Sequence, residues 1–122
     1  MQGDMLLKVI DPETSSFRDI AIAEGEMFML PAHVPHSPVR FANTVGLVVE
    51  RTRPEGQEDA MRWYCPNRDA HGDTPTLIKE SRFFCTDLGS QLKPVIDAWK
   101  ADEAGRQCTA CGRVAGEREL PA

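Results

Sequence analysis

Short apolar runs separated by turn-forming residues dominate the first half of the chain. Five runs are predicted as β-strands, because each is a short apolar stretch bounded by Gly, Pro, Asp or Ser: residues 5–11, 17–22, 27–30, 44–52 and 61–65. Short strands at this spacing favour a sandwich or a barrel. A barrel of six or more strands does not fit into residues 5–65, so we expect a sheet that is incomplete at its N-terminal edge.

The second half of the chain has a different pattern. Residues 76–84 are one further strand candidate. Four apolar residues recur at helical spacing: Leu92, Val95, Ile96 and Trp99. They predict a helix over residues 91–104, capped by Ser90, with Pro94 in the first turn, where its missing N–H does little harm. The expected fold is therefore mainly β, with a C-terminal helix.

Composition excludes several classes of partner. The 122 residues suit one modest domain, and 41% hydrophobic with 27% charged residues is ordinary for a globular protein. The formal net charge of −5, with no basic patch, argues against nucleic acid as a partner. No apolar run approaches the roughly 18 residues of a membrane span, and the start lacks the features of a signal peptide. We therefore expect a cytoplasmic protein without a membrane partner.

The stretch "GEMFMLPAHVPHSPVR" holds two of the three histidines. Its spacing resembles the second conserved motif of the cupin superfamily, G-x5-P-x-G-x2-H-x3-N, with Gly25, Pro31 and His36 on the fixed positions. His33 stands in place of a glycine and Arg40 in place of the asparagine. The resemblance implies that His36 begins a strand, points into a barrel and binds a metal ion. His33 is expected in the turn, facing solvent or bonded locally.

A longer set of motifs resembles one cupin family, the 3-hydroxyanthranilate 3,4-dioxygenases, in their fungal form. These motifs are "LPAHVPHSPVRFANTVGLVVERTRPEG", "MRWYC", "CTDLGSQLKPVIDAW" and a late C-x-x-C-G. The family uses non-haem Fe(II) and O₂ to open the ring of 3-hydroxyanthranilate. Its product, 2-amino-3-carboxymuconate semialdehyde, cyclises to quinolinate on the kynurenine route from tryptophan to NAD. The resemblance implies a cupin (double-stranded β-helix, jelly-roll) barrel.

The resemblance also assigns roles to three residues. His36 matches the second histidine that binds the catalytic iron. Arg40 matches the residue that holds the substrate carboxylate, for which a guanidinium offers two parallel donors. Glu50 matches the glutamate that contacts the polar ring substituents. Taken without the resemblance, both Arg40 and Glu50 are more often surface residues.

The family's other two iron ligands, a histidine and a glutamate, match nothing in this chain. We therefore expect a family member that lacks its N-terminal part, with residues 1–64 as the C-terminal part of the barrel and residues 65–122 as an extension. Because one ligand of three is present, we expect little or no dioxygenase activity from the chain as written.

The cysteines suggest a second metal site. The chain has four: Cys65, Cys85, Cys108 and Cys111. Relatives of the family carry a rubredoxin-like site made of two C-x-x-C knuckles, which would bind iron or zinc. Cys108 and Cys111 match the late knuckle, and Cys65 matches the first position of the early one, whose second position is Arg68. Cys85 is our first choice for the fourth ligand and His71 is the alternative. Free thiols or a redox pair remain open.

Two other functions stay open from the sequence. One is a non-catalytic cupin-like module with a structural zinc or iron site. The other is a different metal cupin that acts on an acidic aromatic compound or a sugar. The sequence does not distinguish a monomer from a homodimer.

Overall fold

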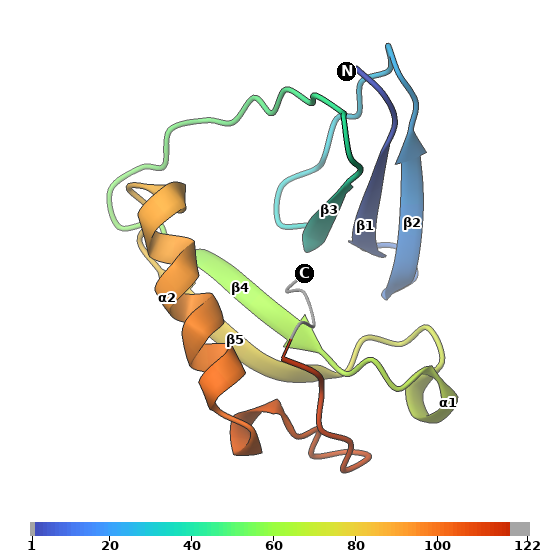
Figure 1. Ribbon diagram of the computed structural model, residues 1–122, viewed down its shortest axis with the longest axis vertical. Coiled ribbons are helices and arrows are strands. Elements are labelled where there is room, and N and C mark those ends of the chain that lie inside the picture. The colour runs from blue at the N-terminus through green and yellow to red at the C-terminus, as the bar shows by residue number, and fades with distance from the viewer. Residues whose placement is uncertain (1, 118–122) are drawn as a thin grey trace. The chain divides into compact units, whose positions relative to one another are not determined.

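Strand β1 (Met5–Asp11) lies at the centre of a three-stranded antiparallel sheet in the computed structural model, which describes residues 2–117. Strand β2 (Ser16–Ile22) lies on one side of β1 and β3 (His36–Arg40) on the other (Figure 1). Residues 2–51 and 73–75 form this N-terminal unit, and residues 52–72 and 76–117 form a C-terminal unit. The two strands predicted at 5–11 and 17–22 are confirmed.

One face of the sheet carries the core of the N-terminal unit. Leu7 and Val9 are buried on alternate positions of β1, together with Ile22 from β2. Four partly buried apolar residues pack against them: Met5, Ile20, Leu30 and Val34. The face of the sheet that carries this cluster is its inner face, and the residues of β3 that project to the same side lie on that face.

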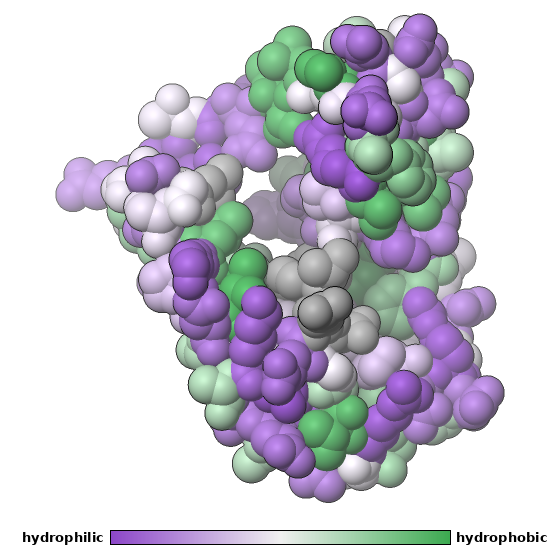
Figure 2. Space-filling view, viewed as in Figure 1, coloured by the Kyte–Doolittle hydropathy of each residue, from purple (hydrophilic) through white to green (hydrophobic). Residues whose placement is uncertain are grey.

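Two predicted strands do not form among the described residues. Residues 27–30 have no strand, and the segment 44–52 contributes only an isolated bridge between Val45 and Gln2. A strand requires the backbone groups of a neighbour, and neither segment has a partner strand in the described part of the chain. Their side chains are consequently exposed, with Met27 at 98% and Val49 at 86%. Figure 2 shows that hydrophobic patches lie among hydrophilic ones on the face in view.

The C-terminal unit is a β-hairpin with a long helix. Its elements in chain order are β4 (Asp59–Tyr64), α1 (Arg68–His71), β5 (Leu77–Phe83), α2 (Leu88–Ala101) and the short 3₁₀ helix η1 (Ala104–Arg106). β4 and β5 pair antiparallel, which confirms the strands predicted at 61–65 and 76–84. β4 thus belongs with the second unit, although the sequence suggested that residues up to 64 belong with the barrel.

Helix α2 lies along the hairpin and closes its core (Figure 1). Trp63 of β4 stacks on Trp99 of α2, with ring centroids 4.8 Å apart and planes 9° from parallel. Stacked aromatic pairs add to the free energy gained by burial alone. The predicted apolar face of the helix is confirmed, because Leu92, Val95 and Ile96 pack against the same core.

The start of α2 differs from the prediction. Asp87, not Ser90, caps the helix by accepting a hydrogen bond from the N–H of Gly89 at 3.0 Å, and the Ser90 hydroxyl donates to Asp87. Pro94 therefore lies inside the helix rather than in its first turn. Since proline has no N–H, it cannot donate to the carbonyl of Ser90 one turn earlier.

The mainly β fold is confirmed, but neither sheet closes into a barrel within residues 2–117. No helix in that range is both long enough and apolar enough to cross a membrane.

Candidate functional site

Strand β3 presents His36 and Arg40 on one face of the N-terminal sheet. It runs antiparallel to β1, with His36 opposite Val9 and Pro38 opposite Leu7. Residues directly opposite in an antiparallel pair project from the same face, and alternate residues of one strand share a face. His36, Pro38 and Arg40 therefore lie on the face that carries the buried Leu7 and Val9.

The local contacts of His36 leave one ring nitrogen directed away from the backbone. Its Nδ1 lies 3.0 Å from the carbonyl oxygen of Val34, so the Nδ1–H donates there and Nε2 keeps its lone pair. A backbone carbonyl on one nitrogen is the usual way to orient a histidine that binds a metal through the other. His36 and Arg40 are both exposed.

His33 has a different place. It lies in the turn before β3, is exposed, and has a φ of 62°, in the left-handed region that glycine adopts most easily. The position at which the cupin motif has glycine is thus one where the backbone favours glycine. His33 is therefore a residue of the turn, as the sequence predicted.

Glu50 is exposed and lies in an irregular segment rather than at the end of a strand. Within residues 2–117, neither Glu50 nor any other acidic residue, cysteine or histidine joins His36 in a group of three possible metal ligands. Among the described residues, His36 therefore has no neighbours that could complete a metal site with it.

A separate group of side chains gathers in the C-terminal unit. The sulfur atoms and the imidazole nitrogen of four residues lie within 4.8 Å of one another: Cys65, His71, Cys108 and Cys111. The sulfurs of Cys65 and Cys111 are 3.6 Å apart, and the Cys108 sulfur is 3.6 Å from Nε2 of His71. Cys65 and Cys108 are buried, and the other two are half-buried.

Cys108 and Cys111 belong to a tight knuckle that follows η1. The N–H of Gly112 donates to the carbonyl oxygen of Cys108, and the N–H of Cys108 donates to the carbonyl oxygen of Arg113. Gln107 and Val114 form an isolated antiparallel β-bridge beside them. Gly112 has a φ of 79°, which glycine adopts without strain. The C-x-x-C-G sequence thus turns both sulfurs to one side.

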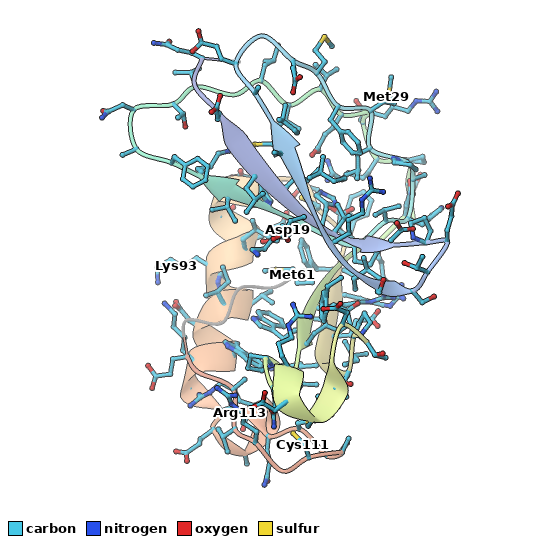
Figure 3. All side chains as sticks on the ribbon, turned by 90° about the vertical axis from the view of Figure 1, so that its right-hand side faces the viewer. Asp19, Met29, Met61, Lys93, Cys111 and Arg113 are labelled. Atoms are coloured by element: carbon cyan, nitrogen blue, oxygen red, sulfur yellow. The ribbon has the colours of Figure 1, made fainter. Side chains whose placement is uncertain are left out.

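The other two ligands come from the end of β4 and from α1. Cys65 directly follows β4, and His71 is the last residue of α1, which Asn67 caps by accepting from the N–H of Ala70. Figure 3 shows Cys111 beside this short helix.

Cys85 is wrong as the fourth member of this group. The hairpin register places Phe83 opposite Asp59, so Cys85 lies beyond the start of β4, whereas Cys65 lies beyond its end. At about 3.3 Å per residue, the six residues of β4 separate the two by roughly 20 Å. His71, the alternative, holds the fourth place.

The surroundings shift two thiols in opposite directions. The backbone N–H of Arg113 lowers the pKa of Cys111 to about 6, with further hydrogen bonds from Cys65, Asn67 and His71 acting in the same sense. Burial raises the pKa of Cys65 to about 11. The Cys65 thiol is consequently the donor and the Cys111 thiolate the acceptor between these two sulfurs.

The donor set fits a tetrahedral metal ion. With Zn–S bonds of about 2.3 Å, two sulfurs of a tetrahedral site are about 3.8 Å apart. The sulfurs of Cys65 and Cys111 are 3.6 Å apart, which is close to that value. Three sulfurs and one imidazole are a common ligand set of structural zinc sites.

Comparison with known proteins agrees with the motifs. Residues 1–100 match the family model described as 3-hydroxyanthranilic acid dioxygenase. The chain belongs to this family. A 3-hydroxyanthranilate 3,4-dioxygenase of Mycosarcoma maydis is 74% identical over 121 residues, which are 99% of this chain and 66% of that protein. A protein of Aspergillus clavatus named 3-hydroxyanthranilate 3,4-dioxygenase 2 is 55% identical over 94% of the chain and 58% of its own length.

The chain thus spans about three fifths to two thirds of the length of these family members. Sequence reasoning named Cys65, Cys108 and Cys111 of the Cys/His group as first choices and His71 as an alternative. It did not point to Asn67, which lies beside the group. Its signal was present, because asparagine two residues after Cys65 and directly before "RDAH" is a favoured helix cap.

Proposed function

We propose that the chain is part of a 3-hydroxyanthranilate 3,4-dioxygenase in which β3 supplies one iron ligand and the substrate anchor. The observation that carries the proposal is the common face of His36 and Arg40 on β3, next to the buried Leu7. Family membership and the names of the relatives support 3-hydroxyanthranilate as the substrate. His36 would be one of the residues that hold Fe(II), and the bound metal would supply the activation of O₂ for ring cleavage.

The spacing of the two side chains suits a small aromatic acid. Four residues of strand separate their Cα atoms by about 13 Å, at about 3.3 Å per residue. Arg40 offers two parallel N–H donors to a carboxylate. Pro38 and Leu7 form an apolar floor between the two polar ends, on which an aromatic ring can lie. The Nε2 of His36 is available to a metal ion at the far end.

The chain by itself is not expected to catalyse ring cleavage. Because the described residues supply one iron ligand, the remaining two must come from elsewhere in the active protein. The dioxygenase activity is therefore proposed for the complete protein, as is a role for Glu50 at the substrate.

A chimera tests this function. This chain replaces the homologous 121 residues of the Mycosarcoma maydis protein, and ring cleavage is followed by absorbance with Fe(II) and O₂. We expect the chimera to be active and His36→Ala to reduce kcat/KM by more than about 100-fold, since loss of even a supporting hydrogen bond to a metal ligand costs about 10- to 100-fold. The matched control is His33→Gly, which should leave the rate unchanged. Equal effects of the two substitutions would refute the assignment of His36.

Arg40 is tested in the same chimera. Arg40→Lys keeps the charge and loses the parallel pair of donors, so we expect KM to rise about tenfold, with a smaller change in kcat. A selective loss of kcat at unchanged KM would contradict its role as the carboxylate anchor.

We further propose that Cys65, His71, Cys108 and Cys111 bind one structural zinc ion. The mutual distances of the four ligand atoms support this, and a set with imidazole and sulfur favours Zn²⁺ over Fe²⁺. Such a site joins the end of β4, α1 and the knuckle after η1. A thiol cluster without metal is the competing interpretation.

Zinc retention against a chelator distinguishes the two interpretations. We expect His71→Ala to lower zinc affinity by at least about 100-fold, whereas Cys85→Ala leaves it unchanged. If Cys85→Ala removed the metal and His71→Ala did not, the ligand set would be wrong.

A further inference from the structure

Asn67 contacts three of the four residues in the Cys/His group. Its side-chain Nδ2 donates to the sulfur of Cys111 at 3.6 Å, and its carbonyl oxygen accepts from the N–H of His71 at 3.1 Å. Its backbone N–H donates to the sulfur of Cys65. Its Oδ1 accepts from the N–H of Ala70 at 3.3 Å and caps α1.

The two ends of the Asn67 amide serve different halves of the site. Helix α1 has four residues and is too short to be stable by itself. Its cap therefore fixes the position of His71, the last residue of the helix. The Nδ2–H lies against the sulfur of Cys111, which would bind a metal as a thiolate. Hydrogen bonds to an ionised acceptor are about twice as strong as neutral ones.

We propose that Asn67 is the positioning residue of this metal site, with its side-chain amide linking Cys111 of the knuckle to the helix that carries His71. The inference rests on the metal binding proposed above. Groups that hold metal ligands by hydrogen bonds typically change metal affinity about 10- to 100-fold when they are removed. Asn67 has this role toward a thiolate, in addition to its role as a cap.

A helix cap without the bond to sulfur is the competing explanation, and two substitutions separate it. Asn67→Ser keeps a good cap, but its hydroxyl is too short to reach Cys111. Asn67→Ala loses both bonds. If Asn67 is only a cap, serine replaces it fully. If the Asn67 amide also supports Cys111, serine does not fully replace asparagine.

Cobalt(II) titration of the full chain gives the readout. Cobalt takes tetrahedral sulfur sites, and its thiolate-to-metal charge-transfer band reports on the electron density of the sulfurs. We expect Asn67→Ser to weaken Co(II) binding about tenfold and to move the band to lower energy, because the sulfur loses a donor. Asn67→Ala should weaken binding by about 10- to 100-fold. Asp69→Asn, on the exposed surface of α1, is the control and should bind within about twofold of the parent.

Each other outcome overturns the proposal in a distinguishable way. If the parent chain binds no Co(II), the metal site and the role of Asn67 both fall. If the parent binds and Asn67→Ser matches it in affinity and band position, only the role of Asn67 falls. Fluorescence of the stacked Trp63 and Trp99 monitors the fold of the same unit. A changed spectrum in Asn67→Ser before metal is added would assign Asn67 to folding and also overturn the proposal.

Discussion

Cys111 is the thiol of the metal group that ionises first. The N–H of Arg113 lowers its pKa to about 6, while burial raises that of Cys65 to about 11. Because only the thiolate reacts with iodoacetamide, the reactivity of a cysteine rises as the pH increases through its pKa. In the metal-free chain, we expect alkylation of Cys111 to rise with a midpoint near pH 6, and Cys65 to stay unreactive at neutral pH.

Mass spectrometry of the alkylated peptides between pH 5 and 9 measures both residues at once. Bound zinc should protect Cys111 across that range. A midpoint for Cys111 near 8.5, the ordinary value for cysteine, would contradict the proposed surroundings.

Single residues show what the sequence could and could not predict. Spacing from Gly25 and Pro31 was enough to separate His36, at the start of β3, from His33 in the turn. Spacing along the sequence could not identify the fourth member of the Cys/His group. A count of cysteines favoured Cys85, whereas the antiparallel register of β4 and β5 decided for His71.

At the scale of elements, Arg106 connects helix α2 to the knuckle. Its buried guanidinium donates to the carbonyls of Trp99, Lys100 and Ala115, at 3.2, 2.6 and 3.0 Å. The positive charge also lies at the C-terminal end of α2, where the helix dipole favours it. We expect Arg106→Ala to lower the free energy of unfolding by about 3 kcal/mol, because hydrogen bonds from a charged group contribute about 1.5–3 kcal/mol.

Urea unfolding followed by tryptophan fluorescence measures this loss. Arg113→Ala is the matched control, since Arg113 is exposed and should change stability by no more than about 0.5 kcal/mol. Similar losses in both variants would mean that Arg106 does not hold the end of the helix.

The strands that the pattern of apolar residues predicted correctly are those whose partner is adjacent in the chain, whereas the start of β3 at His36 was expected only from the family resemblance. β1 and β2 form one hairpin-like pair, and β4 and β5 another. β3 gave no alternating pattern, because Pro38 and polar residues occupy it. Pro38 is tolerated since β3 is at the edge of its sheet. The runs at 27–30 and 44–52 have the composition of strands, but a strand also needs a neighbouring strand to pair with, and composition does not show whether one is present.

At the scale of the whole molecule, the unpaired apolar segment predicts self-association. Residues 46–49, which follow the bridge at Val45, read "GLVV", and Leu47 and Val49 are 85% and 86% exposed. Exposed apolar segments with free backbone groups invite pairing between chains, which a charged residue opposes. We expect Leu47→Lys with Val49→Lys to lower the association measured by light scattering. Thr52→Lys with Gln57→Lys, at exposed polar positions, adds the same charge as a control and should have a smaller effect.

The central proposal is that this chain binds one metal ion through its Cys/His group and supplies a single ligand to a second metal. Native mass spectrometry of the purified chain, given Zn(II) and Fe(II) together without oxygen and then desalted, tests it most directly. The account predicts one zinc ion per chain and no retained iron, because His36 has no companion ligands in the described residues. A chain without zinc, or a chain that retains an iron ion beside the zinc, would contradict it.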